Sequence, residues 1–250
     1  MGGRGASSSL SGGIKKKFRG QLDNGFDYNG RVHEKDLDEL NKKALAQIIK
    51  DTGYSENKAK ELQSDMQDYL GGDYKGFEQG KYPAKVKTID EGLSKMPSYD
   101  GEIYRGMHLD NDTMKSFENL KQGDPIKMKS ISSWSSNEDV ATSYGFVNDY
   151  QTNSVIFVCD NNKSGCGVQH ISKWGKGESE VLLPSTAKWK VTQNKTQTKY
   201  DYLKSEYKKS LEQAKIPPQK IMYQNLLNDL EANKDKYMKS KISVIKVKEY

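Results

Sequence analysis

Cysteine is scarce in this chain, and long hydrophobic runs are missing. Two cysteines, Cys159 and Cys166, occur among 250 residues, which is too few for a disulfide framework. We therefore expect free thiols, with one local disulfide as the alternative. No apolar run approaches the roughly 18 residues that a membrane-spanning helix needs. Residues 1–20 also lack the apolar segment of a Sec signal peptide.

Motifs for metals and nucleotides are missing as well. The three histidines, His33, His108 and His170, lie far apart and give no metal-ligand spacing, so we expect no metal. Neither a P-loop nor the glycine fingerprint of a dinucleotide-binding βαβ unit occurs. Any nucleotide would have to bind by another route.

Positive charge is concentrated at one end of the chain. The net charge is +6. Residues 1–20 contain five basic residues and no acid, which leaves +1 for the rest (6 − 5). The body is therefore not a basic nucleic-acid domain. Residues 1–30 are rich in Gly and Ser and predict a flexible arm. Contact of this arm with nucleic acid or another acidic partner stays open.

The remainder, residues 31–250, divides by its hydrophobic period. In residues 31–100 apolar residues recur every three to four positions, which predicts a lobe of three helices. From residue 101 the segments become short and β-branched or aromatic, which predicts strands: EIYRGMHL, PIKMKSISSW, SVIFVCD, SEVLLP, AKWKVTQ and ISVIKVKEY. Residues 200–238 return to a helical pattern, broken at Pro217-Pro218. The sequence therefore predicts an α+β protein whose strand-rich core, 101–250, carries a helical insertion.

Two glutamates open one of the expected strands. Glu178 and Glu180 are two positions apart in KGESEVLLP, so in extended chain their side chains point the same way, about 7 Å apart. Like charges at that distance repel each other. A solvated strand edge explains the pair equally well when it is taken alone.

An arginine and a pair of serines lie on earlier strands. Arg105 follows Tyr104 and precedes Gly106 in IYRGM. Its planar guanidinium suits a phosphate or carboxylate, and Gly106 would let a ligand approach the backbone. Ser133 and Ser135 share one face of SISSWSS, where hydroxyls can align a ligand.

The order of these features is more specific than any one of them. Arginine strand, Ser-x-Ser strand followed by a short helix, then Glu-x-Glu strand resembles the R-S-E class of mono-ADP-ribosyltransferases, the cholera- and clostridial-toxin-like group. YDGEIYRGM, ISSWSSNEDVATSYG and HISKWGKGESEVLLP are similar to its three motifs, over roughly residues 84–192. One departure is Trp134, which replaces the family's threonine, and we expect its ring to fill the other face of the strand. The His-Tyr-Glu set of the diphtheria-like group is not found.

The resemblance implies a fold, a co-substrate and roles. The fold would be a two-sheet NAD-binding core with an N-terminal helical lobe. NAD would be held by Arg105, Ser133 and Ser135, with Tyr104 and Gly106 beside the arginine. Ser133 would also belong to the catalytic set, because it would help to position the catalytic glutamate. Glu180 would be the catalytic glutamate, also in contact with NAD. Glu178 matches the residue with which arginine-modifying enzymes hold their acceptor, and Trp174 lies where the recognition loop carries an aromatic.

The implied activity is transfer of ADP-ribose from NAD to an arginine of a target protein. Two other enzymatic activities stay open: hydrolysis of NAD, and ADP-ribosylation of a nucleic acid or a small guanidine. A third alternative is a non-catalytic phage head module. The resemblance suggests a bacterial or phage origin, a target in a host or competing cell, and a possible delivery or virion partner. The protein would be cytoplasmic where it is made, or delivered into the host cytoplasm.

Overall fold

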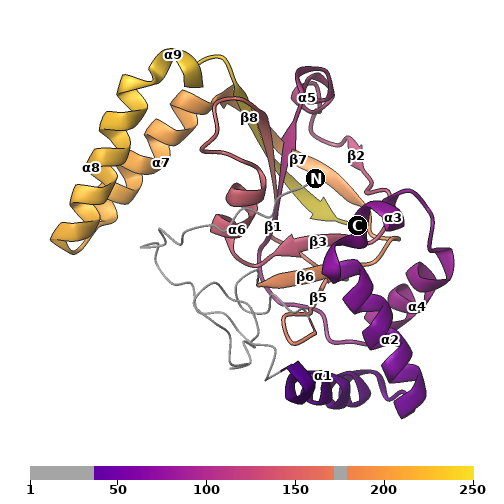
Figure 1. The fold of residues 1–250 in the computed structure, drawn as a ribbon. Coiled ribbons are helices and arrows are strands. Elements are labelled where there is room, and N and C mark those ends of the chain that lie inside the picture. Colours follow the sequence, from indigo (N-terminus) through magenta and orange to yellow (C-terminus); the bar gives the residue numbers. More distant parts are fainter. Residues whose placement is uncertain (1–36, 172–178) are drawn as a thin grey trace.

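The computed structural model describes residues 37–171 and 179–250. It is a mixed α+β structure, as the sequence predicted: helices surround one large sheet (Figure 1). Residues 1–30, expected to form a flexible arm, lie outside the described ranges.

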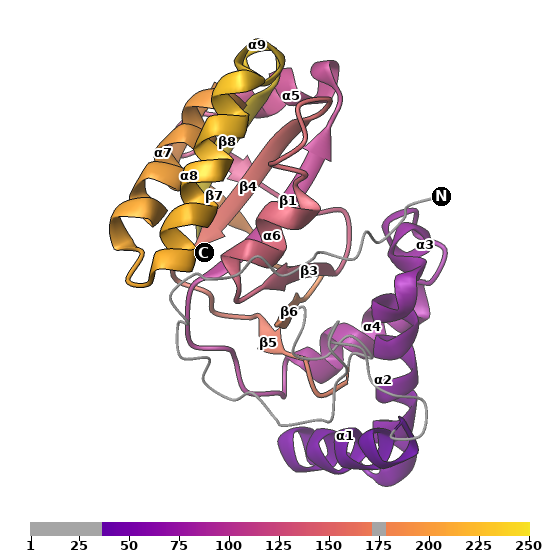
Figure 2. The same ribbon diagram turned by 60° about the vertical axis from the view of Figure 1, so that its left-hand side comes forward.

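The N-terminal helices form a lobe beside the sheet (Figures 1 and 2). It consists of α1 (Leu37–Thr52), α2 (Glu56–Asp68), the kinked turn η2 (Tyr69–Asp73), α3 (Tyr74–Glu78) and α4 (Pro83–Leu93). The predicted apolar stripes are its core, with Ile48, Leu62 and Ile89 fully buried. This core continues into the sheet through Ile131 and Leu182, so the lobe is packed onto the strands.

The sheet has eight strands in the order β2-β7-β8-β4-β1-β3-β6-β5. They are β1 (Ile103–Leu109), β2 (Pro125–Ile126), β3 (Ser132–Ser135), β4 (Asn153–Cys159), β5 (Cys166–Gly167), β6 (Glu180–Leu183), β7 (Trp189–Thr198) and β8 (Lys241–Glu249). The segment PIKMKSISSW, expected as one strand, forms both β2 and β3. The last strand, β8, is parallel to β4 and antiparallel to β7, and it lies between them inside the sheet.

The two expected sheets are joined into one. β1 pairs with β4 along seven residues, whereas β1 and β3 share a single pair, Tyr104 opposite Ser135. β3 then pairs with β6 along its four residues. The β3-β6-β5 part is thus attached to the larger part at one point, and the candidate site lies at that point.

Apolar side chains fill the face of β3 and β6 opposite the serines. Trp134 is 3% exposed and its ring lies 5.5 Å from that of Trp189. Its indole nitrogen donates a hydrogen bond to Ser132 Oγ at 3.1 Å. The expectation that Trp134 fills the other face is confirmed. Cys159 and Cys166 are both free and buried, and burial raises their pKa values to about 11 and about 12.

The helical insertion is a hairpin between β7 and β8. It comprises α7 (Lys199–Gln213), α8 (Pro217–Ala232) and the short α9 (Lys234–Tyr237). In Figures 1 and 2 its orange and yellow helices lie side by side along one margin of the molecule. At its base, the buried Lys199 Nζ donates hydrogen bonds to the carbonyl oxygens of Phe146 (2.8 Å) and Asp149 (2.6 Å). This anchors the hairpin to the loop before β4.

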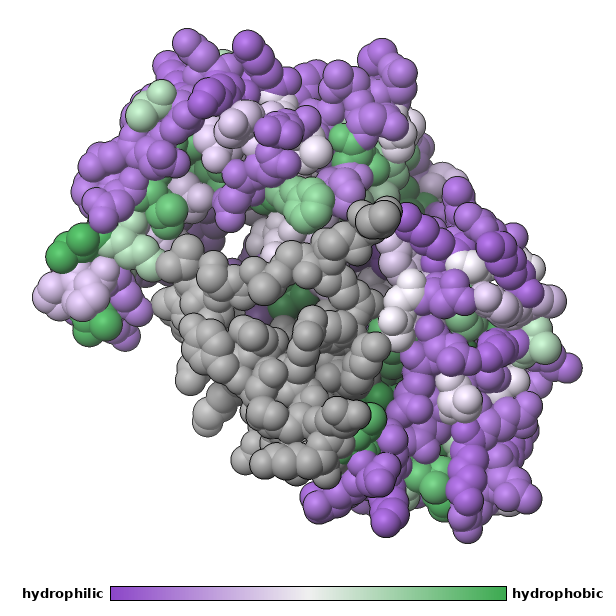
Figure 3. All heavy atoms as spheres, viewed as in Figure 1, coloured by the Kyte–Doolittle hydropathy of each residue, from purple (hydrophilic) through white to green (hydrophobic). Residues whose placement is uncertain are grey.

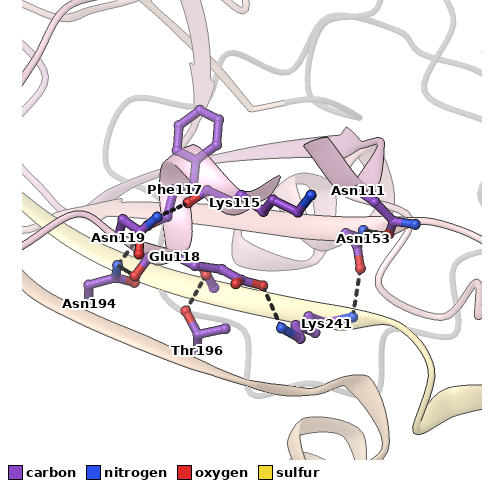
Figure 4. A network of polar contacts seen from close by, with 10 residues as sticks. Asn111, Lys115, Phe117, Glu118, Asn119, Asn153, Asn194, Thr196 and Lys241 are labelled. Carbon is purple, nitrogen blue, oxygen red and sulfur yellow. Dashed lines mark hydrogen bonds and ion pairs between the residues drawn. The ribbon is translucent and has the colours of Figure 1, made fainter. Parts of the chain in front are cut away.

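A further helix not foreseen from the sequence, α5 (Asn111–Glu118), is fixed to β7 and β8 by polar contacts (Figure 4). Asn194 Nδ2 donates to the carbonyl oxygens of Phe117 (2.8 Å) and Leu120 (3.0 Å). Lys241 Nζ lies 3.0 Å from a carboxylate oxygen of Glu118. Across the described residues, no helix is long and apolar enough to cross a bilayer.

Candidate active site at the junction of β1, β3 and β6

Arg105 reaches from β1 to the backbone of β3. Its Nη1 donates a hydrogen bond to the carbonyl oxygen of Ser133 at 2.6 Å, and its Nη2 lies 3.9 Å from Glu78 Oε1. The side chain is 19% exposed. Its Nε is buried and has no hydrogen-bond partner among the residues that the structure describes. A buried donor without a partner costs free energy, and a bound anion would satisfy it.

Ser133, Ser135 and Glu180 occupy the same face of neighbouring strands. Ser135 is directly opposite Glu180 in the β3-β6 pair, and Ser133 is two positions away on β3. Residues opposite each other in an antiparallel pair have Cβ atoms about 5 Å apart. Ser133 is half-buried, whereas Ser135 is buried and its Oγ accepts a hydrogen bond from the Asn137 backbone at 3.0 Å. Ser133 is therefore the more accessible hydroxyl.

Glu180 is the first residue of β6 and is 7% exposed. The residue before it, Ser179, is not extended: its φ is +46°, in the left-handed region. Its carbonyl accepts hydrogen bonds from the Ser136 backbone (2.9 Å) and Oγ (3.2 Å). Glu178 and Glu180 were expected to share a face because side chains alternate along an extended strand. That alternation does not extend to Ser179, whose left-handed conformation is fixed by its hydrogen bonds with Ser136 in the β3–α6 connection.

The helical lobe contributes two side chains to the site, Tyr69 and Glu78, that the sequence did not suggest. Tyr69 donates its hydroxyl to the carbonyl oxygen of Ile131 at 3.1 Å. Burial raises the pKa of Tyr69, Arg105 and a hydrogen bond with Ser133 oppose the rise, and the charges of Glu180 and Glu78 add to it. Tyr69 thus lies among Arg105, Ser133 and Glu180. Its spacing fits the apolar stripe of the helix, so the sequence carried no separate signal for it.

Tyr104 and Gly106 were expected beside a bound ligand, but in the structure both pack against other parts of the protein. The Tyr104 ring is 4% exposed within the core that α6 (Glu138–Tyr144) covers, and its hydroxyl donates to Glu102. A Cβ on Gly106 would lie 1.7 Å from the carbonyl oxygen of Ala141. The backbone of α6, not a ligand, therefore approaches Gly106, and the expected role of this glycine is corrected.

Glu178 and Trp174 lie outside the described residues, so their predicted roles stay predictions. Within the described ranges, no group of three or more His, Cys, Asp or Glu side chains is arranged to hold a metal ion.

Comparison with known proteins gives one relative by sequence. No family model matches the chain. Over 121 residues it is 26% identical to the NAD(+)–arginine ADP-ribosyltransferase Vis of Vibrio splendidus. The chain resembles the bacterial arginine ADP-ribosyltransferases. This confirms the resemblance inferred from the motifs, although the match covers 47% of this chain and 47% of Vis, slightly less than half of the relative's length.

Solved ADP-ribosyltransferases are also similar in structure. The complex of Vis with agmatine aligns with 16% identity over 85% of each chain and a TM-score of 0.44. Plx2a, an ADP-ribosyltransferase toxin from Paenibacillus larvae, aligns with 12% identity over 90% of this chain and 99% of its own, with a TM-score of 0.49.

Proposed function

We propose that this protein is a mono-ADP-ribosyltransferase that transfers ADP-ribose from NAD to an arginine side chain and releases nicotinamide. The observation that carries the proposal is the meeting of Arg105, Ser133 and Glu180 at one junction of the sheet, from three separate strands. The relative Vis is named for the same reaction.

The residues at the junction fit NAD. Arg105 holds Ser133 through Nη1, while its buried Nε has no partner among the described residues. A guanidinium held in this way can present its remaining donors to a phosphate. Ser133 would position the nicotinamide ribose, and Tyr69 would define the wall that the lobe contributes. NAD supplies the reactive bond between ribose and nicotinamide.

Glu180 would act where positive charge develops. Cleavage of the bond between ribose C1′ and the nicotinamide nitrogen gives the ribose oxocarbenium character, as in glycoside hydrolysis. A carboxylate held against the ribose 2′-hydroxyl stabilises that charge most strongly in the transition state. Glu180 is buried, and the low dielectric of its surroundings strengthens this interaction.

Glu178 would serve the acceptor. A guanidinium is protonated at ordinary pH and is a poor nucleophile. A carboxylate beside it can hold it and take its proton as the bond from nitrogen to C1′ forms. In this proposal the acceptor arginine belongs to a target protein in a host or competing cell, which the enzyme reaches by secretion or from a virion.

The test is transfer to agmatine, a small guanidine. We expect the wild type to convert NAD and agmatine into nicotinamide and ADP-ribosyl-agmatine, as followed by mass spectrometry. Glu178→Gln should lose transfer while it still hydrolyses some NAD, because only the acceptor loses its base. Nicotinamide release without transfer by the wild type would favour NAD glycohydrolase activity. Absence of nicotinamide release with any acceptor, including a host lysate, would contradict the enzyme proposal and favour a structural module.

A further inference from the structure

The end of the α7–α8 hairpin presents hydrophobic side chains to solvent. Ile216 is 51% exposed and Ile221 is 61% exposed, the two most exposed large aliphatic residues in the described part of the chain. They lie on the connection between the helices and in the first turns of α8. In Figure 3 green surface appears at this free end of the hairpin, far from the core. We call residues 208–223 the hairpin tip.

Lysines neighbour these isoleucines in the sequence. The hairpin tip contains four lysines and one acid, Glu212, a net charge of +3 (4 − 1). All four are exposed, and none forms an ion pair with another residue of the described ranges; they are Lys208, Lys209, Lys215 and Lys220. Long lysine side chains can extend past an inserted apolar group to reach surrounding anions.

The backbone at the apex is suited to a medium of low dielectric. The first two residues of α8 are prolines, Pro217 and Pro218, and have no N–H. The next two N–H groups, of Gln219 and Lys220, both donate to the carbonyl oxygen of Ile216, at 3.1 and 3.3 Å. A helix start usually leaves donors without partners, and such donors oppose entry into lipid. In this helix the first four positions leave none.

We propose that the hairpin tip binds an anionic lipid surface, with Ile216 and Ile221 inserted among the acyl chains and the lysines at the headgroup phosphates. Peripheral membrane segments combine these two contributions. Tyr223, half-buried on α8, is placed to lie at the interface between water and lipid. The proposal is independent of the reaction assigned to the site.

A protein partner fits the same features less well. Protein interfaces are depleted of lysine, and a stable one buries about 800 Å² on each side. A protruding apex with two isoleucines is small for such an interface, whereas insertion into lipid needs only the apex. The charge of the tip is complementary to anionic headgroups.

The experiment is flotation of the full-length chain with phosphatidylcholine vesicles, with and without phosphatidylglycerol. We expect flotation only with the anionic vesicles and a loss of binding at high salt. The double variant Ile216→Ser, Ile221→Ser should bind at least ~10-fold more weakly. The double variant Lys215→Gln, Lys220→Gln should bind roughly 25-fold more weakly, at about fivefold for each lysine.

Two controls make the result specific. Tyr250→Ser removes a side chain that is 53% exposed at another place, and should bind like the wild type. The circular dichroism spectrum and the midpoint of urea denaturation should be unchanged in both tip variants, which shows that they are folded. The proposal is overturned if the wild type does not float with anionic vesicles, or if the isoleucine variant floats as well as the wild type. It is also overturned if a poly-glutamate resin retains the wild type as tightly as the vesicles do, because the tip would then be a cationic patch for an acidic protein.

Discussion

Arg105 donates a hydrogen bond to the carbonyl oxygen of Ser133 at 2.6 Å. The contact joins β1 to β3 beside the single residue pair that connects these strands, Tyr104 opposite Ser135. A charged side chain therefore holds the junction where Glu180 begins the next strand. The same guanidinium that we assign to NAD also organises the strands around it.

Replacement of Arg105 by lysine tests whether one side chain both holds the strands and binds NAD. Lysine retains the charge but not the planar fork, so it cannot hold Ser133 and a phosphate together. We expect the KM for NAD to rise at least ~10-fold, equivalent to the loss of about 1.4 kcal/mol of binding. Steady-state kinetics of nicotinamide release measure this change. An unchanged KM with a protein of normal thermal stability would remove Arg105 from the NAD site.

Tyr69→Phe tests whether the lobe takes part in the site. The variant loses the hydrogen bond to Ile131 and the hydroxyl near Ser133, so we expect destabilisation of about 1 kcal/mol and a fall in NAD turnover of roughly tenfold. Tyr54→Phe is the matched control. Its hydroxyl is buried with no partner among the described residues, so its removal should leave both stability and turnover unchanged or slightly improved. Equal NAD turnover in the two variants would show that Tyr69 contributes to packing only.

Gly106→Ala should destabilise the protein through α6. The new Cβ would lie 1.7 Å from the carbonyl oxygen of Ala141, and the helix must move to admit it. We expect a loss of about 3 kcal/mol or more in the free energy of unfolding, measured by urea denaturation. At Gly71, where a Cβ meets nothing within 4 Å, alanine should be neutral. If Gly106→Ala is also neutral, the packing of α6 on β1 is not as described.

The buried Lys199 should give the stability a measurable pH dependence. Burial lowers its pKa to about 8, a shift that Asp149 partly offsets. Between pH 8 and the ordinary lysine value near 10.5, the unfolded chain retains a proton that the folded chain has lost. Stability therefore rises with pH across this window, by about 3 kcal/mol at most. The difference between wild type and Lys199→Met in urea denaturation isolates this contribution, and a difference that is constant with pH would contradict it.

The sequence predicted the strands of the core and the lobe, and the structure brings three of its candidate site residues together. Arg105, Ser133 and Glu180 could be named as candidates because each lies on a short strand whose order along the chain is a recognisable pattern. Tyr69 and Glu78 could not, because they reach the site through packing between the lobe and the sheet, which local periodicity does not encode. The turn at Ser179 was also missed, since two hydrogen bonds from Ser136 override the strand preference of the residues that follow.

The most direct test is the rate of nicotinamide release from NAD by wild type and Glu180→Gln, with circular dichroism to show that both are folded. The substitution removes the charge and retains the shape, so it removes the stabilisation of the transition state and little of the ground-state binding. We predict release by the wild type and a fall of at least ~10² in the variant, with NAD still bound. Equal rates for the two proteins would contradict the assignment of Glu180 as the catalytic residue.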